Sequence, residues 1–487
     1  MIEWLINKFN GKFFNIAVLG FSMLFVAANA ILVSRDTFYL NLLPFALVAM
    51  LLILFSPEKV FFLLILLAPL SVPLSDFVPG LDFDFWFPTE PILVALLVLT
   101  VLKSVHDRFF DRNLLVHPVF WAILFYLLWL VIATIPSEMP IVSIKYVLVR
   151  FWFITVFFYI SYLLFLRSEA NFKRFFSLFL IGLSAVVLIS LNKQIARGLF
   201  DKYAAHGSCN PFFTDHTSYG AALALVIPVI LGYLALSKTM KNKAILSILA
   251  LFFIAALILS YTRAAWLSLI IGGMVWALWY LRIRLRTVVF AVMLSISAVL
   301  VFQEEISRWL NYNQTDSSGN LREHLHSVTN IKTDDSNVER LNRWTSAIRM
   351  FHERPIFGWG PGTYMFQYAP YQASYLKTLE SSNLGTKGNA HSEYLGLLAE
   401  AGFIAPIGYI LILIVVLYRG FVISVRSQIQ KDRVIVVSVL IGLITYVVHG
   451  ALNNFLDMDK IAAIFWGYIA FVIAMDVKYR GLQKLES

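Results

Sequence analysis

Long apolar runs, separated by short polar connectors, make up most of the 487-residue chain. Many of these runs reach the roughly 20 residues that an α-helix needs to cross a bilayer. Solid runs of this kind exclude a transmembrane β-barrel, whose strands alternate between apolar and polar positions. The pattern predicts about 14 spans of that kind, at residues 13–33, 37–56, 60–77, 89–105, 115–135, 143–166, 171–191, 217–237, 243–260, 264–281, 287–303, 391–417, 433–452 and 460–477.

One long polar segment, residues 304–390, interrupts this pattern. A loop of this size in an apolar chain indicates a function, because loops carry binding and catalytic residues disproportionately often. Within it, residues 336–353 repeat apolar side chains at helical spacing, with Ser336 as a candidate N-cap and Pro355 just beyond the end. These signals predict an amphipathic helix inside the loop.

The composition supports the same class, because 59% of the residues are hydrophobic and only 14% are charged. A soluble enzyme of this length would carry more charge. We therefore expect an all-α polytopic membrane protein of about 12–14 transmembrane helices. Its expected organisation is helices 1–11 in residues 1–303, a large loop in 304–390 and helices 12–14 in 391–487.

The formal net charge of +10 raises the question of nucleic acid. The basic residues instead concentrate in every second connector, as the positive-inside rule requires, so no nucleic-acid partner is expected. The connector at 78–88, by contrast, has no Lys or Arg. This alternation predicts that both termini are cytoplasmic and that the 304–390 loop lies outside. The basic connectors are at 103–112, 167–174, 238–243, 282–286, 419–433 and 478–484.

Several basic residues fall on the predicted outer face. Arg263 lies in a very short turn between two apolar runs, where it either snorkels to lipid headgroups or presents a planar fork suited to phosphate. Arg150 falls inside a span, which is costly unless the side chain pairs or faces a polar cavity. Lys145 lies close to it in the outer half of the same span, and His216 opens another span.

The large loop adds two arginines and a histidine. Arg340 and Arg343 lie on the predicted loop helix, where a solvated charged face is the simpler explanation for either one alone. His391 opens the span predicted at 391–417. The helix dipole there lowers the pKa of a histidine and favours the neutral form that a general base needs. The alternative is a polar capping residue at the membrane interface, and Glu400 on the same helix is expected to be structural.

Motifs for metals and nucleotides do not appear. The chain has a single cysteine, Cys209, and no HExxH pattern or clustered Cys and His residues that would predict zinc. It has no GxxxxGK[ST] motif for ATP either. The FGWGPG run at 357–362 does not follow a strand, and it predicts a turn that returns the loop helix to the membrane rather than a dinucleotide site. We therefore expect neither a metal nor a cofactor.

Four motifs follow one another in a characteristic order. They are YTRAAW around Arg263, R-x-x-x-W from Arg340, P-[IL]-x-G-x-G from Pro355, and H-[NS]-x-[YF]-L-x-x-x-x-E-x-G from His391 to Gly402. This ordered set resembles the O-antigen ligase and O-antigen polymerase superfamily of bacterial membrane glycosyltransferases. The resemblance covers about 260–410, and Ser392 departs from the frequent asparagine of the last motif.

The resemblance implies a GT-C-like, metal-independent, inverting glycosyltransferase in the bacterial inner membrane, with its site facing the periplasm. The implied donor is a glycan on undecaprenyl diphosphate. The implied acceptor is a sugar hydroxyl on lipid A–core, for a ligase, or on a second lipid-linked glycan, for a polymerase. By motif position Arg263 and Arg340 would bind the diphosphate, and His391 would act on the acceptor hydroxyl. Further candidates for substrate contacts are Arg343, Arg150, Lys145 and His216.

Two other classes compete with this hypothesis. A transporter of lipid-linked glycan would show charges near the bilayer midplane and repeat symmetry between its halves, and neither is clear in the sequence. A membrane scaffold would not need the histidine and the arginines. Ligase and polymerase share the motifs; the His-Ser-Glu-Tyr-Leu run and the single large loop favour the ligase type.

Overall fold

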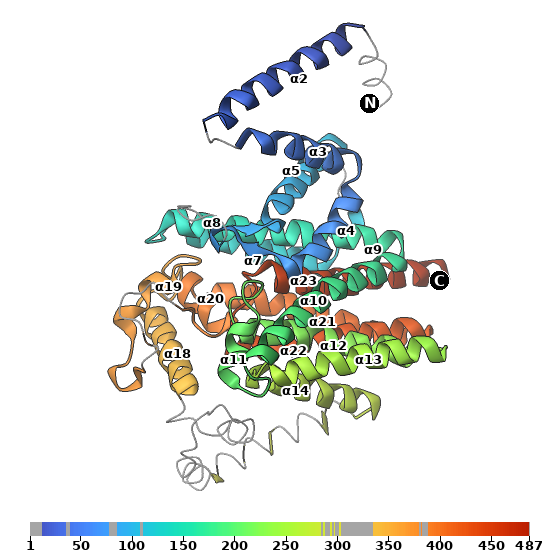
Figure 1. The fold of residues 1–487 in the computed structure, drawn as a ribbon. Helices are drawn as coiled ribbons and strands as arrows, with labels where there is room; N and C mark the ends of the chain where they lie inside the picture. Colours follow the sequence, from blue (N-terminus) through green and yellow to red (C-terminus); the bar gives the residue numbers. More distant parts are fainter. Residues whose placement is uncertain are drawn as a thin grey trace. The chain divides into compact units, whose positions relative to one another are not determined.

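The computed structural model describes residues 12–35, 39–76, 85–107, 111–283, 335–378 and 388–486, together with Ser381 and a few positions between 286 and 302. The chain divides into two compact units, residues 1–61 and residues 62–487. Figure 1 shows the ribbon with labels on most of the helices.

The first unit is built from helices near the N-terminus. It holds α2 (Lys12–Val33), the 3-10 turn η1 (Tyr39–Asn41) and α3 (Leu42–Phe55). The helix α3 has 14 residues, which is shorter than the span predicted at 37–56. A proline at position 57 disfavours helix in the residue before it, and α4 (Pro57–Leu67) begins there.

The second unit contains most of the long apolar helices. In the part of the chain that the structure describes, nine helices are long and apolar enough to cross a membrane, and α7 (Pro118–Thr134) is a shorter apolar one. The prediction of an all-α polytopic membrane protein is confirmed. The nine are α5 (Thr89–Asp107), the continuous α8 (Pro140–Phe153), η4 (Ile154–Ile160) and α9 (Ser161–Arg167), α10 (Glu169–Arg197), α12 (His216–Leu236), α13 (Met240–Leu259), α14 (Arg263–Tyr280), α21 (Ile404–Arg426), α22 (Gln430–Leu452) and α23 (Asp459–Glu486).

Short elements connect these helices. The strands β1 (Val72–Pro73) and β2 (Trp86–Phe87) pair antiparallel. The remaining short elements are η2 (Ala68–Leu70), η3 (Leu74–Asp76), α6 (Arg112–Leu115), α11 (Lys202–Ser208), α18 (Asp335–Glu353), α19 (Tyr364–Gln367), η6 (Ala369–Tyr371), η7 (Ser374–Leu376) and α20 (Glu393–Ala401).

Two predicted spans are wrong, and a third cannot be compared. The span at 60–77 is only the 11-residue helix α4 followed by η2 and β1, because Pro69 and Pro73 cannot continue a helical hydrogen-bond pattern. The span at 391–417 is two helices, α20 and α21, separated at Gly402, whose φ of +71° is a left-handed conformation. The span predicted at 287–303 lies almost entirely outside the described residues.

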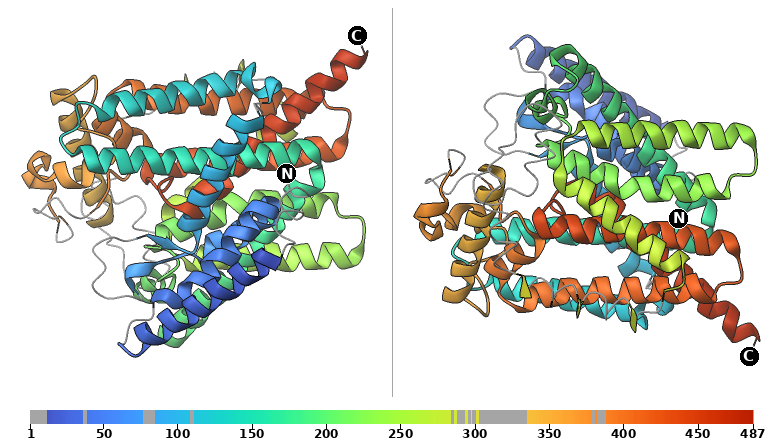
Figure 2. Two further views of the ribbon diagram at one scale, coloured as in Figure 1. Left: turned by 90° about the horizontal axis from the view of Figure 1, so that it is seen from above. Right: turned by 90° about the horizontal axis from the view of Figure 1, so that it is seen from below.

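The middle of the second unit is formed by α23, α12 and α22. Within their membrane spans 94% of α23 and 72% of both α12 and α22 is buried, against 22% for α13 and α14. The outer helices present large apolar side chains outward, among them Ile258, Leu267 and Ile270. Such exposure is expected of helices that face lipid, and Figure 2 shows α12, α13, α21 and α22 side by side along a common direction.

Connectors predicted to be external gather at one end of this bundle. Glu138 N–H donates to the Trp359 carbonyl at 3.2 Å, Thr262 Oγ1 donates to the His216 carbonyl at 2.8 Å, and Leu456 N–H donates to Glu393 at 2.9 Å. These bonds join the connector 135–139 to the large loop, the connector 260–262 to α12, and the connector 453–458 to α20. Figure 2 shows α18 and α20 at this end, away from the C-terminus.

Basic connectors gather at the opposite end, where Lys431 pairs with Glu169 at 2.8 Å and Arg480 with Asp476 at 2.8 Å. This separation is what the positive-inside interpretation requires, while the direction of the bundle in a membrane stays a prediction.

The predicted loop helix is confirmed as α18, but its buried face is not the expected apolar stripe. Ile348, one of the apolar residues at helical spacing within 336–353, is 42% exposed. The helix instead buries a mixed polar and apolar face, so sequence periodicity identified the helix and not its contacts. The buried residues of α18 are Val338, Glu339, Asn342, Arg343, Ser346, Ala347 and Met350.

Candidate active site

The glycine-rich turn after α18 packs directly on α20. Trp359 N–H donates to the Ala399 carbonyl at 3.1 Å, and Gly360 N–H donates to the Glu400 carbonyl at 2.8 Å. A Cβ on Gly402 would lie 1.8 Å from the Ile356 carbonyl oxygen, and one on Gly358 would lie 2.3 Å from the Glu400 backbone. Only glycine allows this approach. The turn predicted at 357–362 therefore joins the loop helix to the helix after His391.

Glu400 fixes the same turn from its side chain. Its Oε1 accepts a hydrogen bond from Tyr364 N–H at 3.0 Å, which agrees with the expected structural role. Burial raises the pKa of Glu400 to about 7. The side chain also lines a pocket, so its role is not limited to packing.

His391 precedes α20 and does not open it, in contrast to the prediction. Ser392 is the N-cap residue, with its Oγ accepting from Leu395 N–H at 3.3 Å. His391 has a left-handed backbone with φ of +48°. Its N–H donates to Asn389 Oδ1 at 3.0 Å, and its carbonyl accepts from Trp344 Nε1 at 3.0 Å. The histidine is thus held between α18 and α20.

The pKa of His391 is lowered to about 4. Burial is the main cause, followed by the positive charges of Arg340 and Arg343, whereas Asn453 and Asp215 act in the opposite direction. The predicted direction is therefore found, but its main cause is not the helix dipole. At neutral pH the imidazole is uncharged. A neutral imidazole can accept a proton.

Arg340 and Arg343 share α18 but have different surroundings. Arg343 is 3% exposed, its Nε donates to Glu339 Oε1 at 2.6 Å, and its guanidinium lies 3.9 Å from the centre of the Tyr368 ring. The expectation of a solvated charged face is wrong for Arg343. Arg340 is partly exposed and donates to Ser336 Oγ at 2.9 Å within its own helix.

Arg263 begins α14, which runs antiparallel to α22. A Cβ on Gly272 would lie 3.0 Å from the Thr445 side chain. Nine residues of helix span about 13 Å, so Arg263 lies at the level where α22 ends. His449 and Asn453 lie there, joined by a 3.2 Å hydrogen bond from Asn453 Nδ2 to His449 Nε2.

The sequence places Asn453 and Asn454 on the predicted outer face without assigning them a role, and it does not single out His449. Asn453 is buried beside His391 and raises the pKa of that histidine through a side-chain hydrogen bond. Buried polar groups are nearly always paired, and this amide lies between His449 and His391. A histidine inside the apolar run of α22 was the available signal, because polar residues in membrane helices are rare.

His216 lies at the same end of the bundle, as the first residue of α12. Its ring stacks on the His206 ring, with centroids 3.7 Å apart and planes 10° apart. The preceding Asp215 acts electrostatically on His391. The loop before α12 therefore reaches the histidine, while the His216 ring is engaged with His206.

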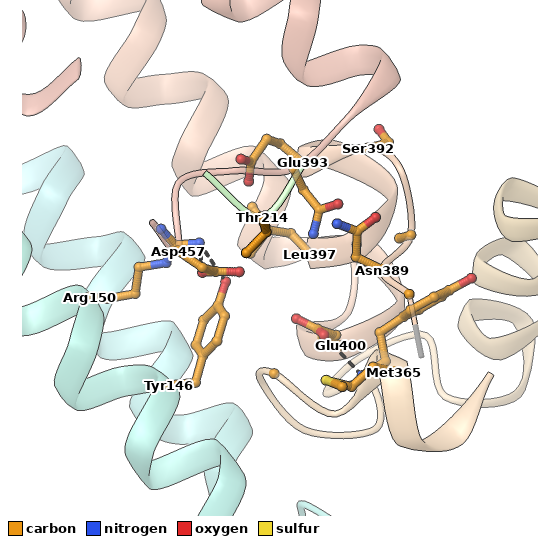
Figure 3. A pocket seen from close by; sticks show the side chains of 16 residues that line it. Tyr146, Arg150, Thr214, Met365, Asn389, Ser392, Glu393, Leu397, Glu400 and Asp457 are labelled. Carbon is orange, nitrogen blue, oxygen red and sulfur yellow. Dashed lines mark hydrogen bonds and ion pairs between the residues drawn. The ribbon is translucent and has the colours of Figure 1, made fainter. Parts of the chain in front are cut away.

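A pocket of about 450 Å³ opens beside the segment that holds His391, and Figure 3 shows its lining. On one side Arg150 pairs with Asp457 Oδ1 at 2.6 Å and donates to Tyr146 Oη at 2.9 Å. Arg150 therefore forms an ion pair and also faces a polar cavity. These are the two conditions that make an arginine inside a predicted span tolerable. Lys145 is exposed and does not line the pocket, so the structure does not bring it to the site.

Residues 245–410 match the family model described as O-antigen ligase. The matched segment is about a third of the chain and is similar to that family. It includes Arg263, Arg340, Arg343 and His391, and the match confirms the resemblance to the O-antigen ligase and polymerase superfamily. A search of curated proteins gives no match. Members of this family are glycosyltransferase-like ligases and polymerases, and the match supports this general type of function for a chain that is a multi-pass membrane protein.

Proposed function

We propose that this protein transfers a glycan from undecaprenyl diphosphate to a sugar hydroxyl, by a metal-independent inverting reaction on the periplasmic face of the inner membrane. The proposed type is an O-antigen ligase with lipid A–core as acceptor. The observation that carries the proposal is His391 held between α20 and the helix α18 that bears Arg340 and Arg343, within the segment that matches the O-antigen ligase family model.

The leaving group requires positive charge. When the bond from the anomeric carbon to the diphosphate oxygen breaks, the electron pair stays with undecaprenyl diphosphate. Arginines aimed at that oxygen stabilise the developing charge and cannot lose their own proton. Arg343 is fixed by Glu339 and Tyr368. Arg340 and Arg263 are the proposed diphosphate ligands, as their positions in the motif order imply, and Arg343 adds positive charge nearby.

The acceptor requires a base. A sugar hydroxyl is a weak nucleophile until its proton is removed in the transition state. His391 accepts that proton as the hydroxyl oxygen bonds to the anomeric carbon, on the side opposite to the leaving diphosphate. The low pKa keeps His391 ready for this step across the neutral range.

The position in the bundle suits a lipid-linked donor. The segments that hold His391 and Arg340 lie at the end of the membrane helices, and Arg263 begins one of those helices. A lipid whose tail lies between helices and whose diphosphate lies at their ends would meet these residues at the membrane surface.

A transfer assay tests the proposal. Purified protein in detergent receives lipid-linked glycan and either lipid A–core or a second lipid-linked glycan, in excess chelator. We expect transfer to lipid A–core that persists in chelator. Transfer only to the lipid-linked acceptor would identify a polymerase instead, loss in chelator would overturn metal independence, and movement of the lipid across vesicles without transfer would favour a transporter.

A further inference from the structure

The proposed transfer leaves the 450 Å³ pocket unexplained. Its wall includes Ala390 and Ser392, the two residues that flank His391. A group bound in the pocket would therefore lie next to the proposed base. The volume is within the range of roughly 300–1,000 Å³ that small-molecule sites occupy.

The charges of the pocket do not suit a diphosphate. Its one arginine, Arg150, is already paired with Asp457 at 2.6 Å. Glu393 Oε1 accepts from Tyr446 Oη, Phe455 N–H and Leu456 N–H at 2.6, 2.8 and 2.9 Å. With Glu400 added, the described lining carries more carboxylates than cations, so an anionic ligand would be repelled.

The polar atoms of the lining suit hydroxyl groups. Arg150 Nε is a buried donor and Asn454 Oδ1 a buried acceptor, and neither has a partner in the described chain. Asn389 and Thr214 add further amide and hydroxyl groups. Because the pKa of Glu400 is about 7, its carboxyl group can both donate and accept near neutral pH.

The arrangement of these groups is also suitable for a ring-shaped ligand. Figure 3 shows Tyr146, Arg150 and Asp457 on one side of the pocket and Glu400, Met365 and Asn389 on the other. The tyrosines Tyr146 and Tyr364 add aromatic surface to this lining. A sugar ring has polar edges and apolar faces, and both kinds of surface are present here.

We propose that this pocket is a sugar subsite, which binds an uncharged sugar unit of the reacting glycan while the arginines near His391 bind the diphosphate. The proposal rests on the proposed function. Two substrates carry such a unit: the donor, next to its diphosphate, and the acceptor, next to the reacting hydroxyl.

Filling the pocket tests this subsite. Met365→Trp on α19 and Thr214→Trp before α12 add bulk from two separate elements without removing a polar contact of the arginine or the carboxylates. Phe366→Trp is the matched control, because Phe366 is as exposed as Met365, at 37%, and does not line the pocket. Thermal unfolding in detergent confirms that each variant is folded.

Binding is measured with two probes, undecaprenyl diphosphate and the lipid-linked glycan extracted from cells that lack this protein. If the donor sugar occupies the pocket, we expect wild type and Phe366→Trp to bind the glycan-bearing lipid at least tenfold more tightly. Met365→Trp and Thr214→Trp lose that difference and still bind undecaprenyl diphosphate.

A second arm measures the KM of the acceptor. If the acceptor sugar occupies the pocket, both filling variants raise this KM at least tenfold and leave the donor preference unchanged. If folded Met365→Trp and Thr214→Trp keep the wild-type donor preference and acceptor KM, the subsite is overturned. Absence of transfer by the wild type, by contrast, would overturn the proposed function itself.

Discussion

The two sides of the segment around His391 differ in charge. On the α18 side, Arg340 and Arg343 lower the pKa of His391. On the pocket side, Arg150 is neutralised by Asp457 and is accompanied by Glu400. Arg343 is itself paired with Glu339 at 2.6 Å, and Arg340 supplies most of the positive charge that acts on His391 from this side. The site is thus divided into a side that carries this positive charge, suited to diphosphate, and a side whose described carboxylates outnumber its cations, suited to an uncharged sugar.

A large loss of transfer is expected when a positive charge is removed from the α18 side of the site. Arg340→Ala is expected to lower the rate of transfer by about 10²–10³-fold, as loss of one group that stabilises transition-state charge does. Initial rates of transfer by purified protein measure the effect. Arg349→Ala is the control on the same helix, because Arg349 is exposed and donates to the Tyr371 carbonyl. Near wild-type transfer by Arg340→Ala would exclude its role as diphosphate ligand.

A substitution that forces the glycine turn away from α20 should disturb both the α18 side and the pocket side of the site. Gly402→Ala places a Cβ 1.8 Å from the Ile356 carbonyl and forces alanine into φ of +71°. The backbone conformation alone costs about 1–3 kcal/mol. We expect a lower unfolding temperature in detergent and reduced transfer.

Gly273→Ala is the comparison for this experiment, since a Cβ there meets nothing within 4 Å. Equal stability of the two variants would contradict the packing described for the turn.

The pH dependence of kcat/KM gives a finer test of the role of His391. Protonated His391 cannot accept a proton, so kcat/KM should fall as the pH drops through about 4. A histidine with an ordinary pKa would lose activity near pH 6.5 instead. The profile is best recorded in Glu400→Gln, because the pKa of Glu400 is about 7 and its titration would overlap. An acid limb near pH 6.5 in that background would show that His391 is not the base described.

The smallest effect is expected at Lys145. Its side chain is exposed and does not line the pocket, so Lys145→Ala should change transfer less than about twofold, as surface substitutions usually do. The same assay measures it. A loss comparable to that of Arg340→Ala would mean that the substrate extends over the outside of α8.

Sequence periodicity was sufficient for the membrane class, for the helix at 336–353 and for the turn at 357–362. These features depend on local signals, such as a proline after the helix and closely spaced glycines. The predicted cap at Ser336 is wrong, because α18 begins at Asp335 and Ser336 lies within it. The break at Gly402 was missed because apolar residues continue on both sides of it and hide the change of direction.

Contacts between distant segments could not be predicted from the sequence. The burial of Arg343 depends on Tyr368, and the pairing of Arg150 depends on Asp457, about 300 positions further along the chain. The motif order still identified His391, Arg263 and Arg340, since each stands beside a recognisable local pattern. Asn453 has no such pattern, and neither do the pocket residues Tyr146 and Thr214, which only the fold brings together with the motif residues that line the same pocket.

The rate of glycan transfer by His391→Ala tests the central claim most directly. A single-turnover experiment with excess purified enzyme and lipid-linked glycan isolates the chemical step from product release. We predict a rate about 10²–10⁴-fold below wild type, the usual contribution of a general base, with undecaprenyl diphosphate still bound. A His391→Ala protein that transfers glycan at the wild-type rate would contradict the assignment of this site.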